Sequence, residues 1–131
     1  MLCTRPDFSY ALSTTSRYQF DPGETHWIVV KNILKYLRRT KETFLEYGGE
    51  EELAVVGYTD ASFRTDMDDF ISQSGFVFCL NGGAVSWKIS KQETVADSTT
   101  EAEYIAASSA AKEAVWIKKF LTELEVVPRG Q

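Results

Sequence analysis

The sequence predicts a mixed α/β fold of the α+β kind, in which an antiparallel three-strand unit packs against a long helix and follows two earlier helices. Three stretches of the chain predict this fold. Residues 74–89 have the pattern of a tight β-hairpin, and residues 98–124 have that of a capped helix with a stripe of small residues. Residues 53–58 form an apolar run typical of a strand.

The composition is that of an ordinary globular protein. The chain has 131 residues, of which 44% are hydrophobic and 25% charged, which suits one domain or one domain with an appended segment. It has no apolar run of about 18 residues, and its first residues lack the pattern of a signal peptide. Two cysteines, Cys3 and Cys79, are too few for a disulfide framework. We therefore expect an intracellular protein, cytoplasmic or nuclear, without a membrane partner.

The charge is divided unevenly along the chain. Residues 1–47 carry seven Lys and Arg against five Asp and Glu, whereas residues 48–131 carry seven against fourteen. An acidic domain is a poor general binder of nucleic acid, because affinity for phosphate comes mainly from Lys and Arg. The basic residues of the first part could line one helix face, or could simply form a solvated face: Lys31, Lys35, Arg38, Arg39 and Lys41.

Two helices are predicted near the amino end. The first starts at Thr4-Arg5-Pro6-Asp7 and stops before Asp21. The second runs from about Glu24 to Arg39, because apolar residues recur there at steps of three and four: Trp27, Val30, Ile33, Leu34 and Leu37. The single histidine, His26, has no second ligand nearby and is expected to be structural or exposed.

The strands are predicted from alternation and apolar runs. Residues 43–47 alternate enough for a short strand, and residues 53–58 have the pattern of a strand covered on both faces. A polar loop follows, with Asp66, Asp68 and Asp69. Asn81-Gly82-Gly83 then supplies the positive φ angles of a tight turn, which joins the strands 74–80 and 84–89.

The long helix has a clear start and an apolar face. Ser98 is predicted to cap it, with Glu101 completing a capping box. The face that follows begins with alanines and ends with larger residues: Ala102, Ala106, Ala110, Ala114, Ile117, Leu121 and Leu124.

Carboxylates at the strand end and the helix start form the candidate site. Asp60 follows the apolar run directly, and Glu101 and Glu103 lie in the first turn of the helix. Glutamates two residues apart point to different sides, so only one of them can face Asp60. A divalent metal takes such oxygen ligands. The plainer alternatives are a turn-forming Asp60 and a Glu101 that serves only the helix cap.

Several ordered motifs resemble the ribonuclease H domain of copia-type retrotransposon Pol polyproteins. They are Gly57-Tyr58-Thr59-Asp60-Ala61, Ser72-Gln73-Ser74-Gly75-Phe76-Val77-Phe78, Gly82-Gly83-Ala84-Val85-Ser86-Trp87, Lys91-Gln92, and Ser98-Thr99-Thr100-Glu101-Ala102-Glu103-Tyr104-Ile105-Ala106. Cys3-Thr4-Arg5-Pro6-Asp7 and His26-Trp27 resemble the end of the preceding reverse transcriptase. The resemblance implies that residues 1–42 are the helical end of reverse transcriptase and that residues 43–131 are a partial ribonuclease H-like domain.

What the resemblance implies is cleavage of the RNA strand in an RNA–DNA hybrid, with two Mg²⁺ ions held by carboxylates. By the motif Asp60 matches the first carboxylate and Glu101 the second, with Glu103 as the alternative for the second position. The later acidic positions of the family do not occur in this sequence, and Asp69-Phe70-Ile71-Ser72 replaces a segment that usually carries arginines. We therefore expect an incomplete active site, weak or absent metal binding, and no activity of the chain alone.

Two other functions remain open at this stage. The strand at 53–58 would have an unpaired edge, so the chain could be a non-catalytic interaction module or a domesticated remnant that self-associates through that edge. A product without any selected function also fits the sequence.

Overall fold

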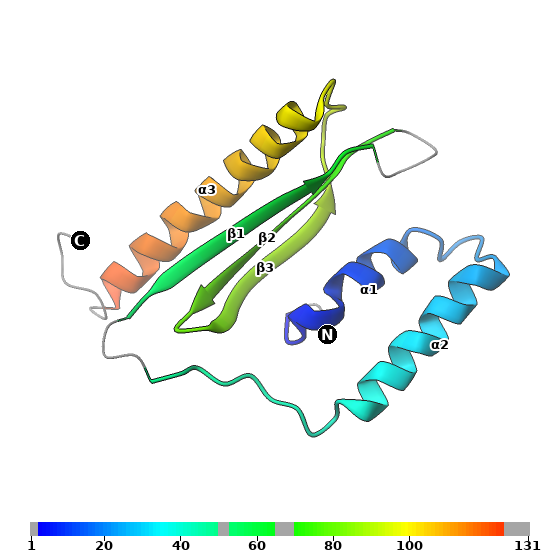
Figure 1. Ribbon diagram of the computed structural model, residues 1–131, viewed down its shortest axis with the longest axis horizontal. Helices are drawn as coiled ribbons and strands as arrows, with labels where there is room; N and C mark the ends of the chain where they lie inside the picture. Colours follow the sequence, from blue (N-terminus) through cyan, green and yellow to red (C-terminus); the bar gives the residue numbers. More distant parts are fainter. Residues whose placement is uncertain (1–2, 50–52, 65–69, 125–131) are drawn as a thin grey trace. The chain divides into compact units, whose positions relative to one another are not determined.

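The computed structural model describes residues 3–49, 53–64 and 70–124 (Figure 1). It contains two compact units, residues 1–45 and 46–131, and each is described here by itself. The aspartates predicted in the acidic loop, Asp66, Asp68 and Asp69, lie outside the described residues.

The first unit is helical. A 3-10 turn at Pro6–Phe8 leads into α1 (Ser9–Ser16), and α2 (Glu24–Arg39) packs against it. The predicted bounds of the second helix are confirmed, whereas the first helix is shorter and begins with the 3-10 turn. Phe8 is buried and contributes to the small core of this unit.

His26 has a structural role, as expected. Its Nδ1 accepts a hydrogen bond from the Gly23 N–H at 2.9 Å, which satisfies a backbone donor at the start of α2. Its ring also stacks on Tyr18, with the ring centroids 3.9 Å apart. The histidine therefore fixes the chain as it enters the helix.

The apolar face predicted for α2 is only partly covered. Val30, Ile33 and Leu37 are half-buried, but Trp27 is 55% exposed and Leu34 is 60% exposed. The reason is geometric. α1 has eight residues and is half as long as the sixteen-residue α2, so it cannot cover the whole apolar stripe of α2.

The second unit is built on a three-stranded antiparallel sheet. Its strands are β1 (Val55–Ser62), β2 (Gln73–Leu80) and β3 (Gly83–Lys91), and their order in the sheet is β1-β2-β3. Asn81 and Gly82 both have positive φ, which gives the two-residue turn predicted between β2 and β3. The register shifts by one residue between Phe78 and Cys79, where a bulge interrupts the hairpin.

The strand predicted at 43–47 does not form. The chain passes the hairpin turn instead, where the Gly48 N–H donates to the Asn81 carbonyl at 3.1 Å. The Tyr47 hydroxyl donates to the Ala84 carbonyl at 3.0 Å. Hydrogen bonds to a turn satisfy this segment without a strand partner, and alternation in the sequence could not reveal that.

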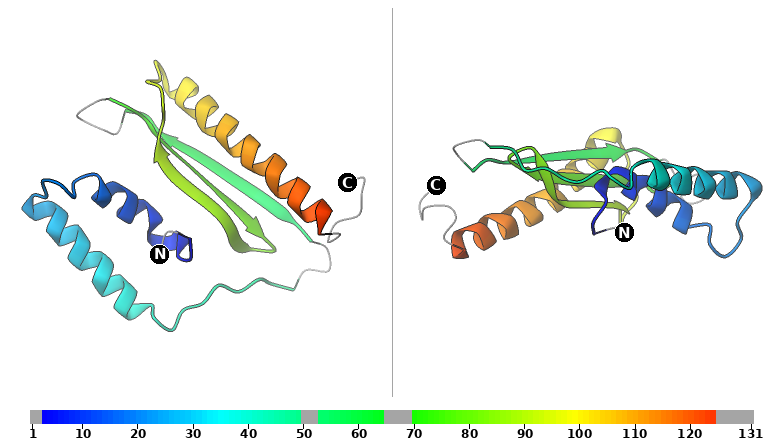
Figure 2. Two further views of the ribbon diagram at one scale, coloured as in Figure 1. Left: turned by 180° about the vertical axis from the view of Figure 1, so that it is seen from behind. Right: turned by 90° about the horizontal axis from the view of Figure 1, so that it is seen from below.

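One long helix, α3 (Thr99–Glu123), packs against β1 and β2 (Figure 2). Its buried residues are the alanines of the predicted stripe and one isoleucine: Ala102, Ala106, Ala110 and Ile117. Phe78 of β2 packs against Ala110 and Ile117, which forms the core between the helix and the sheet. Alanines allow the first half of the helix to lie close to the strands.

β1 is not covered on both faces, contrary to prediction. It is an edge strand with one neighbour, and the side chains of residues 55–60 are exposed. Because α3 is the only helix described in this unit, it can cover only one face of the sheet. An apolar run therefore marked a strand, but it did not show how much of the strand is buried.

Candidate carboxylate site at the end of β1

The end of β1 and the start of α3 meet at the same end of the sheet. Ser62 of β1 pairs with Gln73, which pairs with Lys91 of β3, so these three residues form the last row of the sheet. Figures 1 and 2 show the first turn of α3 at this end as well. Asp60, which pairs with Gly75, lies two residues before this last row.

Buried polar residues hold the first turn of α3 in place. The Gln92 N–H donates to the Ser72 carbonyl at 2.9 Å, and the Gln92 side-chain amide donates to the Ala102 carbonyl at 2.8 Å. Ser72 and Gln92 are both buried. Gln92 thereby joins the end of β3 to the helix turn that carries the glutamates.

Asp60 lies on the sheet face opposite α3. Gly57 pairs with Phe78 and Thr59 pairs with Phe76, and both phenylalanines belong to the core under α3. Because side chains alternate along a strand, Asp60 lies on the other face. Its side chain is exposed, so a ligand can reach it.

Glu101 is used in the helix cap. Its backbone N–H donates to Ser98 Oγ at 3.1 Å, and its Oε2 accepts from the Asp97 N–H at 2.6 Å. Ser98 is therefore confirmed as the cap. The Glu101 carboxylate bonds to the N–H of Asp97, whereas in a capping box it would bond to the N–H of the cap residue Ser98 itself. The helix period places Glu101 away from the buried alanines that face the sheet.

Glu103 lies beside the buried stripe of α3. It precedes Ala106 by three residues and Ala110 by seven, the steps that put residues on one helix face. Ser86 of β3 donates to Glu113 at 2.7 Å, which identifies the flank of α3 that is turned toward β3. Glu103 lies on the other flank, toward β1, and its side chain is exposed.

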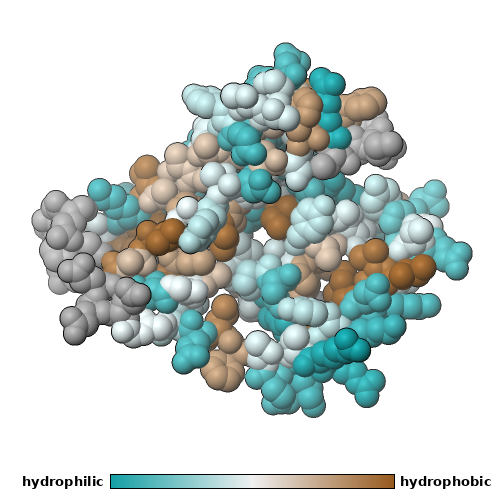
Figure 3. Space-filling view, in the orientation of Figure 1, coloured by the Kyte–Doolittle hydropathy of each residue, from teal (hydrophilic) through white to brown (hydrophobic). Residues whose placement is uncertain are grey.

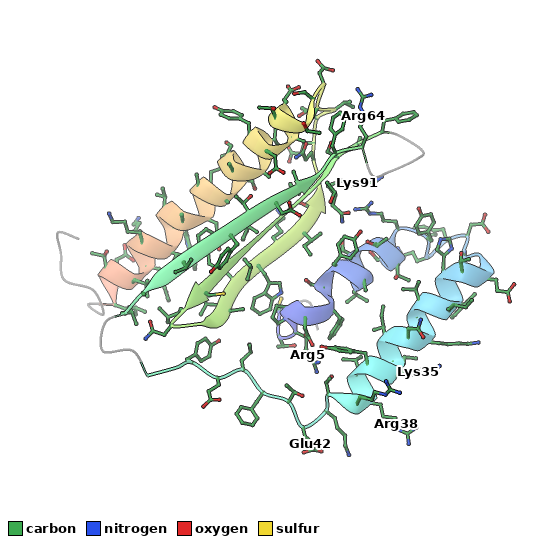
Figure 4. All side chains as sticks on the ribbon, viewed as in Figure 1. Arg5, Lys35, Arg38, Glu42, Arg64 and Lys91 are labelled. Carbon is green, nitrogen blue, oxygen red and sulfur yellow. The ribbon has the colours of Figure 1, made fainter. Side chains whose placement is uncertain are left out.

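Two basic residues for which no role was predicted lie at this end of the sheet, although one of them, Lys91, belongs to a quoted motif (Figure 4). Lys91 ends β3, and Arg64 follows β1 by two residues. The Arg64 N–H donates to Ser72 Oγ at 3.1 Å, and its guanidinium lies over Phe63. Cross-strand register, rather than spacing in the sequence, would have revealed that Arg64 and Lys91 share the end of the sheet with Asp60.

The carboxylates suit a hard cation in type but are few in number. Asp60 and Glu103 come from different elements, and both offer oxygen ligands of the kind that Mg²⁺ takes. Among the described residues, no group of three or more His, Cys, Asp or Glu could hold a metal ion together. The donors at this end of the sheet are thus one aspartate and one of two glutamates.

Comparison with known proteins shows that the chain is similar to Pol polyproteins from transposons. It is 48% identical over 124 residues to the retrovirus-related Pol polyprotein from transposon TNT 1-94 of Nicotiana tabacum, a match that covers 95% of this chain and 9% of that protein. It is 38% identical over 125 residues to the Pol polyprotein from transposon RE1 of Arabidopsis thaliana, covering 94% of this chain and 8% of that protein. The chain thus spans under a tenth of these polyproteins.

A further relative has a length similar to that of the chain. The secreted RxLR effector protein 161 of Plasmopara viticola is 45% identical over 117 residues, which are 89% of this chain and 82% of that protein. The chain belongs to the same family as this protein, and it is similar to a short segment of the retrovirus-related Pol polyproteins from transposons.

Other comparisons add no further relatives. No family model matches the sequence, and no solved structure matches it. In the part of the chain that the structure describes, no helix has the length and apolar character needed to cross a membrane.

Proposed function

We propose that this chain carries part of a ribonuclease H-like unit of a retrotransposon Pol protein, in which Asp60 and Glu103 bind Mg²⁺. The substrate of the complete unit would be the RNA strand of an RNA–DNA hybrid. The observation that carries the proposal is the meeting of the β1 end with the first turn of α3, held by the Gln92 bond to Ala102. The three antiparallel strands followed by a helix, and the Pol relatives, support it.

Glu103 is the better second ligand on geometric grounds. The motif favoured Glu101, but the carboxylate of Glu101 accepts a 2.6 Å bond from the Asp97 N–H and lies on the far side of α3. Using it for a metal would leave that backbone donor without its partner. Glu103 is exposed on the β1 flank, so it and Asp60, which lies on the opposite face of this edge strand, would share an ion around the edge of the sheet.

The chemistry follows from this donor set. Mg²⁺ bound between carboxylates activates a water molecule and stabilises the leaving oxygen of a phosphodiester. Asp60 and Glu103 would hold the ion, while Arg64 and Lys91 would attract the phosphates of the nucleic acid (Figure 4). Two carboxylates supply few of the roughly six oxygens that Mg²⁺ needs, so the chain by itself should bind metal weakly and cleave poorly.

Mn²⁺ titration followed by NMR line broadening tests the ligand assignment. Broadening should centre on the amides of residues 60 and 103, and it should be lost in the Asp60→Asn and Glu103→Gln variants. Glu101→Gln is the matched control, because it removes the same charge from the same helix turn and should leave the broadening in place. Broadening that persists in Asp60→Asn, or that depends on Glu101 alone, would overturn the assignment.

Activity is tested separately with a fluorescent RNA–DNA hybrid. With Mg²⁺ or Mn²⁺ we expect little cleavage by the chain alone. Strong cleavage that Asp60→Asn abolishes would support the site and refute the expected inactivity. Cleavage that survives Asp60→Asn would place the chemistry elsewhere.

A second candidate function rests on the edge of β1. Among the described residues this strand has one neighbour, it contains neither Lys nor Pro, and its Val56 and Tyr58 are exposed. Such an edge can pair with a strand of a second copy. Sedimentation should then show a dimer that Val56→Lys disrupts and that Val115→Lys, a control at an even more exposed position on α3, preserves. A monomer at all concentrations would exclude this function.

A further inference from the structure

The C-terminal half of α2 carries a group of cations without acidic partners. Lys31, Lys35, Arg38 and Arg39 are all exposed, and none makes an ion pair with another described residue. Only Lys41 beyond them is paired, with Glu42 at 3.5 Å. Residues 25–41 contain no Asp or Glu at all. A solvated helix face usually mixes both signs of charge, so this surface has an unbalanced positive potential.

Three of these cations share one helix face with exposed apolar side chains. Trp27, Lys31, Leu34 and Arg38 follow one another at steps of four, three and four, and Lys35 is one turn beyond Lys31. Figure 4 shows Lys35 and Arg38 extending from the same half of α2. Figure 3 shows hydrophobic residues over the middle of α2 and hydrophilic residues toward its end.

We propose that this face of α2 binds single-stranded nucleic acid, with phosphates on Lys31, Lys35 and Arg38 and a base stacked on Trp27. Cations beside an exposed aromatic ring are the combination that single strands require, because bases in a duplex have no free face. Lys31 and Arg38 are roughly 10 Å apart along the helix, from a rise of about 1.5 Å per residue.

A lipid surface fits this face less well. A membrane-bound helix buries a broad apolar side, with its cations along the rim. In α2 the half-buried residues Val30, Ile33 and Leu37 face the interior of the helical unit instead. The exposed apolar residues of the cationic face, Trp27, Ile28 and Leu34, alternate with its cations and do not form a separate apolar side.

The proposal is independent of the carboxylate site, and the experiment keeps the two apart. Fluorescence anisotropy of the full chain with a labelled 20-nucleotide oligo(dT) is measured in EDTA, where no metal-dependent contact can form. With three phosphate contacts, the logarithm of affinity should fall with the logarithm of salt at a slope of about −2. Affinity should therefore drop roughly 20-fold between about 50 and 200 mM salt.

Matched variants locate the binding surface. The triple variant Lys31→Gln, Lys35→Gln, Arg38→Gln should abolish most of the salt dependence. The control triple Lys112→Gln, Lys118→Gln, Lys119→Gln removes the same charge from exposed positions of α3 and should bind as the wild type does. Circular dichroism checks that all variants stay folded, since Lys, Arg and Gln have similar helix propensities.

The stacking contribution is measured with tryptophan variants. Trp27→Ala should weaken oligo(dT) binding by about fivefold or more, whereas Trp116→Ala, whose ring is 57% exposed on α3, should not. The proposal is overturned if both charge variants lose affinity equally, if a duplex binds more tightly than the single strand, or if only anionic vesicles bind. It is also overturned if the wild-type chain shows no salt-dependent binding.

Discussion

At Gly57 the absence of a side chain lets the core of the second unit close. A Cβ at this position would collide with the ring of Phe78, which is buried under α3. The glycine belongs to the same short motif as Asp60. Its role is steric, because the phenylalanine ring lies over the backbone of β1.

Gly57→Ala should therefore destabilise the second unit by about 1–3 kcal/mol, as overpacking in a closed core does. Urea unfolding followed by tryptophan fluorescence measures the loss. The control is Gly49→Ala, since a Cβ there would meet no neighbouring atom and should change stability by less than about 0.5 kcal/mol. Equal effects of the two substitutions would show that Phe78 can move aside.

Asp7 joins the two ends of the helical unit. Its carboxylate accepts from Arg5 Nη2 at 2.7 Å and from the Tyr36 hydroxyl at 2.6 Å, while Arg5 also donates to Thr40 Oγ1 at 2.7 Å. The hydrogen bonds from Arg5, more than any other cause, lower the pKa of Asp7 to about 2. The hydrogen bond from the Tyr36 hydroxyl to Asp7 raises the pKa of Tyr36, because the hydroxyl must stay protonated to donate.

These shifts predict how the helical unit responds to pH. A lowered pKa in the folded state means that the Asp7 contribution to stability is complete above the ordinary aspartate pKa of 3.8 and is lost as pH falls toward about 2. The raised pKa of Tyr36 adds a loss at pH above 10.0. The acid effect should stay below about 1 kcal/mol because the ion pair is solvent-accessible.

Thermal unfolding between pH 2 and 6, followed by circular dichroism at 222 nm, measures the acid effect. Asp7→Asn should flatten the acid limb of the curve. Asp21→Asn, an exposed control in the same unit, should keep the wild-type acid sensitivity. If Asp7→Asn retains that sensitivity, another group is responsible.

At the scale of elements, Ser98 and Gln92 fix the start of α3 by different means. Ser98 Oγ accepts from the Glu101 N–H and satisfies one of the free donors of the helix. Gln92 ties the Ala102 carbonyl to the end of β3. The cap determines where the helix begins, and the glutamine determines where that beginning lies on the sheet.

Ser98→Ala should cost about 1 kcal/mol and speed amide exchange in residues 99–103. Ser108→Ala, at an exposed position in the middle of the same helix, should be neutral or slightly stabilising because alanine is the better helix former. Unchanged exchange in Ser98→Ala would mean that Gln92 alone holds the first turn.

The elements whose signals are local could be predicted from the sequence. Asn81 and Gly82 specify their own turn, Ser98 specifies its cap, and the alanine stripe specifies a closely packed helix. The strand at 43–47 was predicted wrongly, because the bonds of Tyr47 and Gly48 go to Ala84 and Asn81 of the β2–β3 hairpin, more than thirty residues away. The unpaired edge of β1 was expected, but the exposure of its faces was missed, since an apolar run does not record what covers a strand.

The candidate site was predictable in type but not in geometry. The motifs identified Asp60 and two possible glutamates, yet the assignment between Glu101 and Glu103 depends on which side of α3 faces the sheet. That side follows from the packing of Phe78 on Ala110 and Ile117, a contact between distant segments. The position of Arg64 and Lys91 at the same end of the sheet as Asp60 was missed for the same reason.

At the scale of the molecule, the two units have separate cores. The helical unit depends on Phe8 and the Arg5–Asp7–Tyr36 contacts, whereas the sheet unit depends on Phe78 and the alanines of α3. The predicted boundary between residues 42 and 43 and the structural one after residue 45 divide the chain at similar places. The assignment of these parts to reverse transcriptase and nuclease stays a prediction.

Separate cores predict additive effects of mutations. Asp7→Asn and Gly57→Ala share no partner, so in the double variant their changes in unfolding free energy should add within about 0.5 kcal/mol. Hydrogen exchange can assign each change, with Asp7→Asn affecting amides of α1 and α2 and Gly57→Ala those of β1 and β2. A larger coupling would show that the two units unfold together.

The alanine stripe of α3 has one more consequence. Because Ala102 and Ala106 are the smallest side chains that a helix face can present with good propensity, they act as a spacer whose thickness is a single methyl group. Replacing either with valine would push the first turns of α3 away from the sheet. The distance between the Asp60 and Glu103 carboxylates of the proposed site would then increase. In the proposed site, the carboxylate separation that an ion must bridge would therefore depend on two alanines that make no contact with the ion.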